Sequence, residues 1–398
     1  MLHINLNSLL TNMGFRLLLV GAVLIVVHPA QASTATNGWP MNRERAETMQ
    51  HDQFNLEGEE QFAKWSDKKI VLEARSKGRV ELTSDDRDIK SISPGGYLNI
   101  KEDQAGVVRS LEVTPGPAGT LRKSFTVRGE RREFDAEASA WLGTLLPEII
   151  RHTVIGAEAR VQRILSQGGA RNVIDEISLV EPGSAKLIYL RYLFKSNLAS
   201  DDLERVAQLV GRELSSDGDK ARILVETRKS FLGTAAERSF FDALNTIKAG
   251  GDRRRVLSAV IEKNELSRDS LLLAMESARG FSSDGDKAGF LADAAPHYLA
   301  NDELASAFFD VVDSIRAGGD HLRVLSSVLA RQPVRRENIL RAVQSAGRMR
   351  ADGDKSRFLV EVAQLNLNDQ AVTAAVREAA ARIGSEGDRM RVLAALSR

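Results

Sequence analysis

A short motif, Gly-Asp followed four and five residues later by two apolar residues, recurs through the second half of the chain. Successive aspartates of this motif are 33 or 34 residues apart, and they are Asp219, Asp252, Asp286, Asp320, Asp354 and Asp388. A period of this length is typical of helical repeats, in which each unit is too small to bury its own apolar face and stacks on its neighbours. The sequence therefore predicts an α-solenoid.

Each interval has room for two helices. In the copy that begins at Asp219 we expect helices over residues 219–232 and 234–248. The apolar pair Ile223 and Leu224 is followed by further apolar residues about one turn later, which places them on one buried face. The glycine before each aspartate is expected to end the preceding helix in the left-handed conformation, and the aspartate to cap the next helix.

The residues ahead of the array follow a different period. Within 63–134, alternating runs such as 69–74 and 107–113 are separated by turns rich in glycine and proline, such as 93–96. This pattern predicts a small antiparallel β domain of six or seven strands. Asp135 is placed to cap the helix that follows. With a solenoid of about seven helix hairpins over 135–398, the predicted fold class is α+β.

The N-terminus predicts export. Arg16 precedes an apolar run at 17–27, which is followed by Ala30-Gln31-Ala32. This order is typical of a signal peptide over 1–32, cut after Ala32, with a flexible segment at 33–62. A retained membrane anchor is the less favoured alternative, because a spanning helix needs about 20 apolar residues. We expect a periplasmic or secreted protein with no stable membrane insertion after cleavage.

Composition restricts the chemistry. Lysine and arginine total 55 against 54 acidic residues, which gives no support for a nucleic-acid partner. The chain has no cysteine and six histidines without metal-ligand spacing, and it lacks a phosphate loop or a serine nucleophile elbow. The Asp-Gly-Asp steps lack the longer run of oxygen ligands that a calcium loop needs. We expect no cofactor, no metal and no enzymatic activity.

The strongest polar pattern pairs each aspartate with an arginine three residues later. The candidate residues are Asp219, Asp252, Asp320, Asp354 and Asp388 together with Arg222, Arg255, Arg323, Arg357 and Arg391. In the favoured interpretation each arginine pairs with its own aspartate, or with that of an adjacent unit, in a structural ladder. In the alternative the arginines bind an anionic ligand or a peptide carboxylate.

One copy of the motif departs from this pattern. After Asp286, glycine at position 289 replaces the arginine. Glycine removes the ion pair and costs about 1 kcal/mol relative to alanine inside a helix. We therefore expect the array to be weakest here, and we expect Gly289→Arg to stabilise it.

The array resembles HEAT-like solenoids more than tetratricopeptide repeats, whose aromatic pattern it lacks. Residues 88–98 (DIKSISPGGYL), 134–142 (FDAEASAWL) and the Ser-Asp-x-Asp-Lys repeats resemble exported bacterial proteins. Similar arrays follow the peptidase part of some sensor proteins related to the regulators of beta-lactam resistance. The resemblance covers about residues 65–398, and the peptidase zinc motif is absent from this sequence, so no catalytic role is implied.

The resemblance and the repeats together predict a non-catalytic binding or scaffolding protein of the bacterial envelope. Its expected partner is a protein or peptide of that compartment. The alternative function is a sensory or regulatory component associated with a membrane metallopeptidase signalling system.

Overall fold

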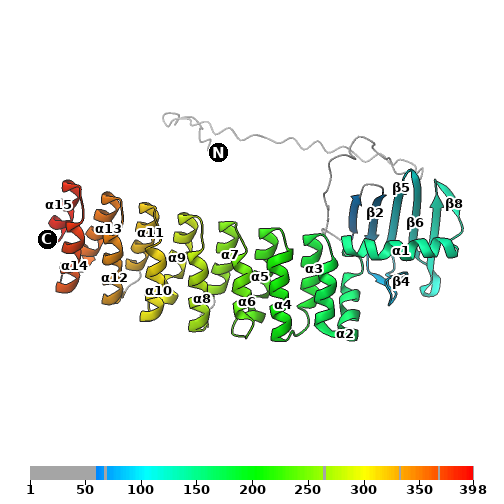
Figure 1. The fold of residues 1–398 in the computed structure, drawn as a ribbon, viewed down its shortest axis with the longest axis horizontal. Helices are drawn as coiled ribbons and strands as arrows, with labels where there is room; N and C mark the ends of the chain where they lie inside the picture. Colours follow the sequence, from blue (N-terminus) through cyan, green and yellow to red (C-terminus); the bar gives the residue numbers. More distant parts are fainter. Residues whose placement is uncertain (1–59, 67–69, 263–265, 331–332, 366–367, 398) are drawn as a thin grey trace, which may run out of the picture. The chain divides into compact units, whose positions relative to one another are not determined.

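The computed structural model describes residues 60–66, 70–262, 266–330, 333–365 and 368–397. In these ranges a small antiparallel β domain is followed by fifteen α-helices, which confirms the predicted α+β class (Figure 1). The predicted signal peptide at 1–32 and the adjoining residues 33–59 lie outside the described ranges.

The β domain consists of one six-stranded antiparallel sheet and a two-stranded hairpin. In spatial order the sheet contains β1 (Glu60–Ser66), β2 (Ile70–Lys77), β5 (Tyr97–Gln104), β6 (Val107–Pro115), β7 (Leu121–Val127) and β8 (Glu130–Arg132). The hairpin pairs β3 (Val80–Leu82) with β4 (Ile89–Ile92), and a short 3-10 turn, η2 (Pro117–Gly119), precedes β7.

Strand β1 corrects the predicted boundary of the flexible segment, because residues 60–62 belong to the sheet. The strand has no β-branched residue, and only Phe62 and Trp65 of its seven residues are of types enriched in strands, so its composition gives a modest β signal. It forms by pairing along its whole length with β2, from Glu60 opposite Lys77 to Ser66 opposite Val71.

Helix α1 (Ala136–His152) packs against one face of the sheet. Its N-cap is Asp135, whose carboxylate accepts a hydrogen bond from the backbone N–H of Ala138 at 3.0 Å, as the sequence predicts. Leu142 and Leu146 are fully buried in the core that α1 shares with the strands. Trp141 Nε1 donates to the buried carboxylate of Glu102 on β5 at 2.8 Å, which satisfies both polar groups.

Fourteen further helices complete the described residues. They are α2 (Ala157–Leu179), α3 (Gly183–Leu193), α4 (Ser200–Glu213), α5 (Asp217–Phe231), α6 (Glu237–Asn245), α7 (Gly250–Ile261), α8 (Arg268–Arg279), α9 (Asp284–Tyr298), α10 (Asp302–Val312), α11 (Gly318–Leu329), α12 (Arg336–Gly347), α13 (Asp352–Leu365), α14 (Gln370–Ala381) and α15 (Glu386–Ala395). Helix α2 is interrupted at Gly169, whose φ of 74° is left-handed. None of the helices in the described ranges has the length and apolarity needed to cross a membrane.

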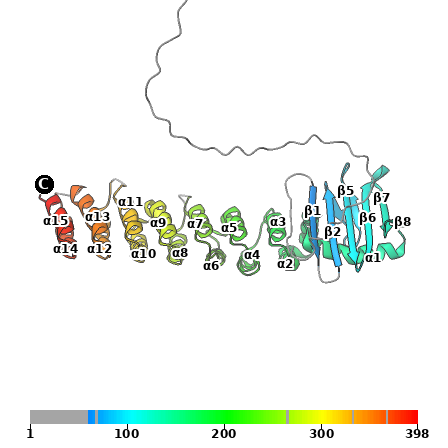
Figure 2. The same ribbon diagram turned by 90° about the horizontal axis from the view of Figure 1, so that it is seen from above.

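Successive helices from α2 onward alternate between two rows (Figures 1 and 2). The odd-numbered helices from α3 to α15 pack against one another in one row, and the even-numbered helices from α2 to α14 pack in the other. Because an even helix lies between each pair of odd helices along the chain, the odd helices all start at the same edge of the array.

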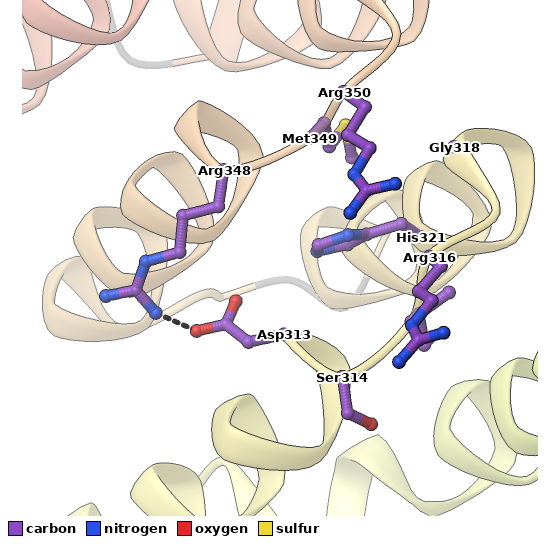
Figure 3. Close-up of a pocket in the computed structure, with 9 residues that line it drawn as sticks. Asp313, Ser314, Arg316, Gly318, His321, Arg348, Met349 and Arg350 are labelled. Carbon is purple, nitrogen blue, oxygen red and sulfur yellow. Dashed lines mark hydrogen bonds and ion pairs between the residues drawn. The ribbon is translucent and has the colours of Figure 1, made fainter.

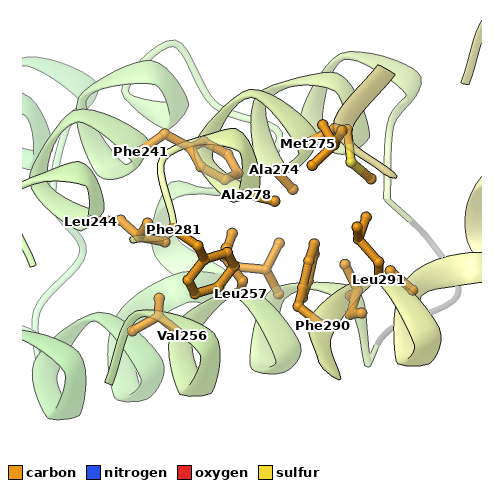
Figure 4. Packing of buried hydrophobic residues seen from close by; sticks show 14 of the residues in the cluster. Phe241, Leu244, Val256, Leu257, Ala274, Met275, Ala278, Phe281, Phe290 and Leu291 are labelled. Carbon is orange, nitrogen blue, oxygen red and sulfur yellow. The ribbon is translucent and has the colours of Figure 1, made fainter. Parts of the chain in front are cut away.

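A single apolar cluster extends through both rows, from Val154 to Val392. Figure 4 shows part of it, where Phe290 of α9 lies near Phe281 and the side chains of α7 and α8. The large side chains Phe240, Phe308 and Phe358 are fully buried in the same way in other helices. Each helix therefore buries apolar side chains both within its own pair, as where Phe231 of α5 lies against Phe240 of α6, and against the next helices in its row.

The β domain contacts the first helices through a buried charge cluster. Asp86, in the turn between β3 and β4, accepts from Arg160 Nε of α2 at 2.8 Å and also pairs with Arg163. The Nη2 atom of Arg160 lies 2.7 Å from Glu176 Oε1. Arg160 is only 6% exposed, so its charge depends on these two carboxylates.

We expect Arg160→Ala to lower the free energy of unfolding by about 3 kcal/mol, because it leaves Glu176 without its cation and Asp86 with Arg163 alone. Thermal denaturation followed by circular dichroism measures the loss. Arg171→Ala, at an exposed position of the same helix, is the matched control and should change stability by about 0.5 kcal/mol or less. Equal losses in both variants would contradict a buried charge cluster.

Candidate binding edge of the helical array

The predicted Asp and Arg residues all lie at the edge where the odd helices begin. Each aspartate is the third residue of its helix and each arginine the sixth, as with Asp219 and Arg222 in α5. Four of the pairs form ion pairs within one helical turn, at 3.9 Å for Arg222–Asp219, 3.2 Å for Arg255–Asp252, 3.1 Å for Arg323–Asp320 and 2.7 Å for Arg391–Asp388. For Arg357 and Asp354, no ion pair is found within the described ranges.

The five arginine side chains are exposed. Their exposed fractions are 57% for Arg222, 51% for Arg255, 50% for Arg323 and 65% for Arg391, and Arg357 is exposed as well. Ion pairs at such positions contribute about 1 kcal/mol or less to stability. We call these five residues, Arg222, Arg255, Arg323, Arg357 and Arg391, the arginine edge.

Two members of the arginine edge also reach the preceding odd helix. Arg255 Nη2 donates to the carbonyl of Gly218 at 3.1 Å, and Arg323 Nη2 donates to the carbonyl of Gly285 at 2.8 Å. These contacts join neighbouring helices through a backbone oxygen, whereas the carboxylate partner of each arginine lies in its own helix.

The predicted role of the motif aspartates as N-caps is wrong. Helix α5 begins at Asp217, and its N-cap is Ser216, whose hydroxyl accepts from the backbone N–H of Asp219. Ser283 and Ser385 cap α9 and α15 in the same way. Asp219 and its counterparts lie instead in the first turn, where the helix dipole favours a carboxylate.

The predicted left-handed glycine is also not observed. The glycine before each aspartate is the second residue of the new helix, and left-handed glycines in the described ranges occur elsewhere. Glycine at the first residue of α7 and of α11 is explained instead by a close contact with a neighbouring carboxylate. A Cβ at Gly250 would lie 2.2 Å from Asp286 Oδ2, and one at Gly318 would lie 2.4 Å from Asp354 Oδ2. The carboxylate of the next odd helix occupies that space.

The first aspartate of each Asp-Gly-Asp step has a function that the sequence analysis missed. Asp284 Oδ2 accepts from the backbone N–H groups of Arg316 and Ala317, each at 2.9 Å, in the loop before α11. Asp217 and Asp352 hold the loops before α7 and α15 in the same manner. Hydrogen bonds from the backbone of Ser385 lower the pKa of Asp352. These carboxylates connect each such odd helix to the next one.

A row of basic side chains directly follows the motif aspartates, and the Ser-Asp-x-Asp-Lys repeats of the sequence contain only its lysines. The residues are Lys220, Arg253, Lys287, His321, Lys355 and Arg389. The first five contact the C-terminal end of the following even helix, as when Lys220 Nζ donates to Thr246 Oγ1 at 3.1 Å and Lys287 Nζ donates to Ser314 Oγ at 3.0 Å. Burial lowers the pKa values of Arg253, Lys287 and His321. The negative end of the helix dipole offsets part of that cost.

His321 occupies this position with a shorter side chain and lines a depression of about 360 Å³ (Figure 3). The depression lies between the loops that precede α11 and α13, and its lining residues are Asp313, Ser314, Ile315, Arg316, Gly318, His321, Arg348, Met349 and Arg350. Arg348 pairs with Asp313, the contact drawn as a dashed line in Figure 3.

His321, Ser345 and Asp313 form a hydrogen-bonded chain whose order excludes a nucleophilic triad. Ser345 Oγ donates to Asp313 Oδ1 at 2.5 Å, and His321 Nε2 lies 2.8 Å from the same hydroxyl. A nucleophile would need the imidazole between the serine and the carboxylate. Ser345 is also 1% exposed, so the chain of bonds ties the ends of α10 and α12 to α11.

Gly289 does not mark a missing contact. The guanidinium of Arg254, from α7, lies across it, and a Cβ at Gly289 would be 2.4 Å from Arg254 Nη1. Arg254 Nη2 pairs with Asp293, one turn further along α9, at 3.0 Å. The expected weak point is therefore bridged by an arginine of the neighbouring helix.

Within the described ranges, no group of three His, Asp or Glu side chains is placed to hold a metal ion.

We expect Asp284→Ala to lower the free energy of unfolding by about 1 kcal/mol, the typical cost of losing a carboxylate that caps free N–H groups. Hydrogen exchange should show faster exchange of the Arg316 and Ala317 amides. Asp242→Ala, at an exposed position of α6, is the control and should alter neither quantity. Unchanged exchange in Asp284→Ala would contradict the role of this carboxylate.

Because the guanidinium of Arg254 lies over Gly289, we no longer expect Gly289→Arg to stabilise the array. A second arginine would displace Arg254 from Asp293 and place like charges together, so we expect no rise in melting temperature. In an Arg254→Ala background, Gly289→Arg should raise the melting temperature, because the space over position 289 is then empty. Identical shifts in the two backgrounds would show that Arg254 and Gly289 are not coupled.

Comparison with models of known protein families, with curated proteins and with solved structures finds no match to this chain.

Proposed function

We propose that this chain is a non-catalytic binding or scaffolding protein of the bacterial envelope whose helices form a HEAT-like α-solenoid. The two rows of helices support a solenoid, as do contacts that recur with the sequence period. Asp217, Asp284 and Asp352, spaced 67 and 68 residues apart, each accept two N–H groups from the loop 31 to 33 residues later. The proposed unit is the 34-residue helix hairpin, with pairs of units alternating.

The observation that carries the binding proposal is the arginine edge. Its side chains are at least half exposed where a fraction is known, and exposed ion pairs add little to stability. Arg255 and Arg323 also donate to a carbonyl of the preceding odd helix, but within the described ranges the other three arginines of the edge make no such contact, so stability alone does not account for the recurring arginine. A guanidinium presents a planar set of donors that matches a carboxylate, so a row of them suits a partner with several acidic groups.

The proposed partner is a protein or peptide of the envelope. The formal net charge of +1 gives no strong field for a nucleic acid, and the arginines of the edge alternate with carboxylates in the same helical turns. Such mixed charge favours a partner of defined shape over a uniform polyanion. Residence in the envelope rests on the signal peptide proposed for residues 1–32.

Affinity capture from envelope extract tests the proposal. We expect the intact chain to retain a defined partner, and the combined change of Arg255→Ala and Arg323→Ala to reduce its recovery about tenfold, because two charge-assisted contacts are removed. The melting temperature should fall only slightly, since both side chains are about half exposed and each loses one ion pair and one hydrogen bond to a carbonyl of the preceding odd helix.

Arg205→Ala and Arg377→Ala form the matched control, because they remove two exposed arginines from the even helices α4 and α14. Recovery of the partner should be unchanged in this control. If the control and the edge variant lose the partner equally, binding depends on total charge and the arginine edge is not the recognition surface.

A further inference from the structure

The depression at His321 differs from its counterpart one pair of units earlier. At that position Arg253 Nη1 donates to the carbonyl of Gly280 at 3.1 Å, and Nη2 donates to Asn245 Oδ1 at 2.5 Å. The guanidinium also lies over the ring of Phe281, 5.9 Å from its centroid. The arginine side chain thus fills the space at the end of α8.

Sixty-eight residues later the same four positions hold His321, Arg348, Asp313 and Met349. The imidazole keeps a contact with the last turn of α12 through Ser345, at 2.8 Å. It is shorter than an arginine, and the lining of the 360 Å³ depression includes all four residues. The replacement of arginine by histidine therefore opens a space that the earlier unit fills.

The rim of this depression carries an excess of positive charge. Arg348 is balanced by Asp313, the one acidic side chain of the lining. Arg316 and Arg350 are exposed, and within the described ranges neither side chain has a hydrogen-bond or ion-pair partner. In Figure 3 their side chains lie on either side of His321. Two guanidinium groups are thus free to bind an anion at the mouth.

Other carboxylates close to the rim limit how much negative charge a ligand can bring. Asp284 accepts from the backbone N–H groups of Arg316 and Ala317, and Asp354 lies against Gly318. They repel a doubly charged phosphate more strongly than a singly charged carboxylate. Ile315 and Met349, each 5% exposed, give the lining an apolar part that suits a methylene group.

From this geometry we propose that the depression at His321 binds the carboxylate of an acidic side chain or chain terminus of a peptide, held between Arg316 and Arg350. This inference deepens the proposed function, on which it rests, by naming the chemical group of the partner and a second contact point beside the arginine edge. His321 acts as a positioning residue, because it leaves the space open and its own ring is held by the contact with Ser345.

Isothermal titration of the full chain with an N-acetylated, C-amidated tetraglutamate peptide tests the proposal. We expect the peptide to bind the intact chain. Combining Arg316→Gln with Arg350→Gln should weaken this binding about tenfold or more, because two charge-assisted hydrogen bonds are lost. His321→Arg should weaken it similarly by filling the space, as Arg253 does in its own unit. Circular dichroism melting checks whether His321→Arg folds. If it does not fold, the combined Arg316→Gln and Arg350→Gln variant alone tests the proposal.

Arg212→Gln, an exposed arginine in the last turn of α4, is the matched control and should leave the affinity unchanged. The tetraglutamine peptide should not bind, and inorganic phosphate should bind more weakly than the tetraglutamate. Tighter binding of phosphate, or tetraglutamate binding that survives both Arg316→Gln with Arg350→Gln and His321→Arg, would overturn the proposal.

The two proposals fail in different ways. If the arginine-edge variants lose the captured partner while the pocket variants keep tetraglutamate binding, the depression is not the carboxylate site and the proposed function stands. If the pocket variants lose tetraglutamate binding while the edge variants keep the partner, the depression binds a carboxylate and the arginine edge is not the recognition surface.

Discussion

Burial of apolar side chains between successive helices is the constraint on which the helical part of the structure depends. Phe240, Phe308 and Phe358 are fully buried, and the cluster that contains them is continuous from Val154 to Val392. Two helices alone are too small to exclude water from such side chains. Each helix is therefore stable in the presence of its neighbours, and the position of every polar group follows from that stacking.

Stacking brings the ends of many helices to one edge, and the polar motif serves those ends. Carboxylates such as Asp284 accept the free N–H groups of the next loop, and basic groups such as Lys220 lie at helix C-termini. These charged groups bond helix ends and loops of the array itself. The motif arginines, such as Arg323, remain exposed beside these groups, and the proposed recognition surface lies along them.

Variation within this scheme creates local differences in the surface. Replacement of Arg253 by His321 in the corresponding unit preserves a bond to the end of the even helix and leaves a depression. Replacement of arginine by Gly289 provides a seat for Arg254. A smaller residue thus leaves an open space at His321 and admits a neighbouring side chain at Gly289, so similar backbones carry different surfaces.

The sequence by itself determined the class of fold, the sheet followed by helices, and the cap at Asp135, because periodicity and capping are local properties of neighbouring residues. It did not determine the partners of the motif residues. Serine instead of aspartate caps α5, and Asp217 bonds a loop that starts about 30 residues later. Only the tertiary structure decided these contacts, because they depend on which helix ends the stacking places side by side.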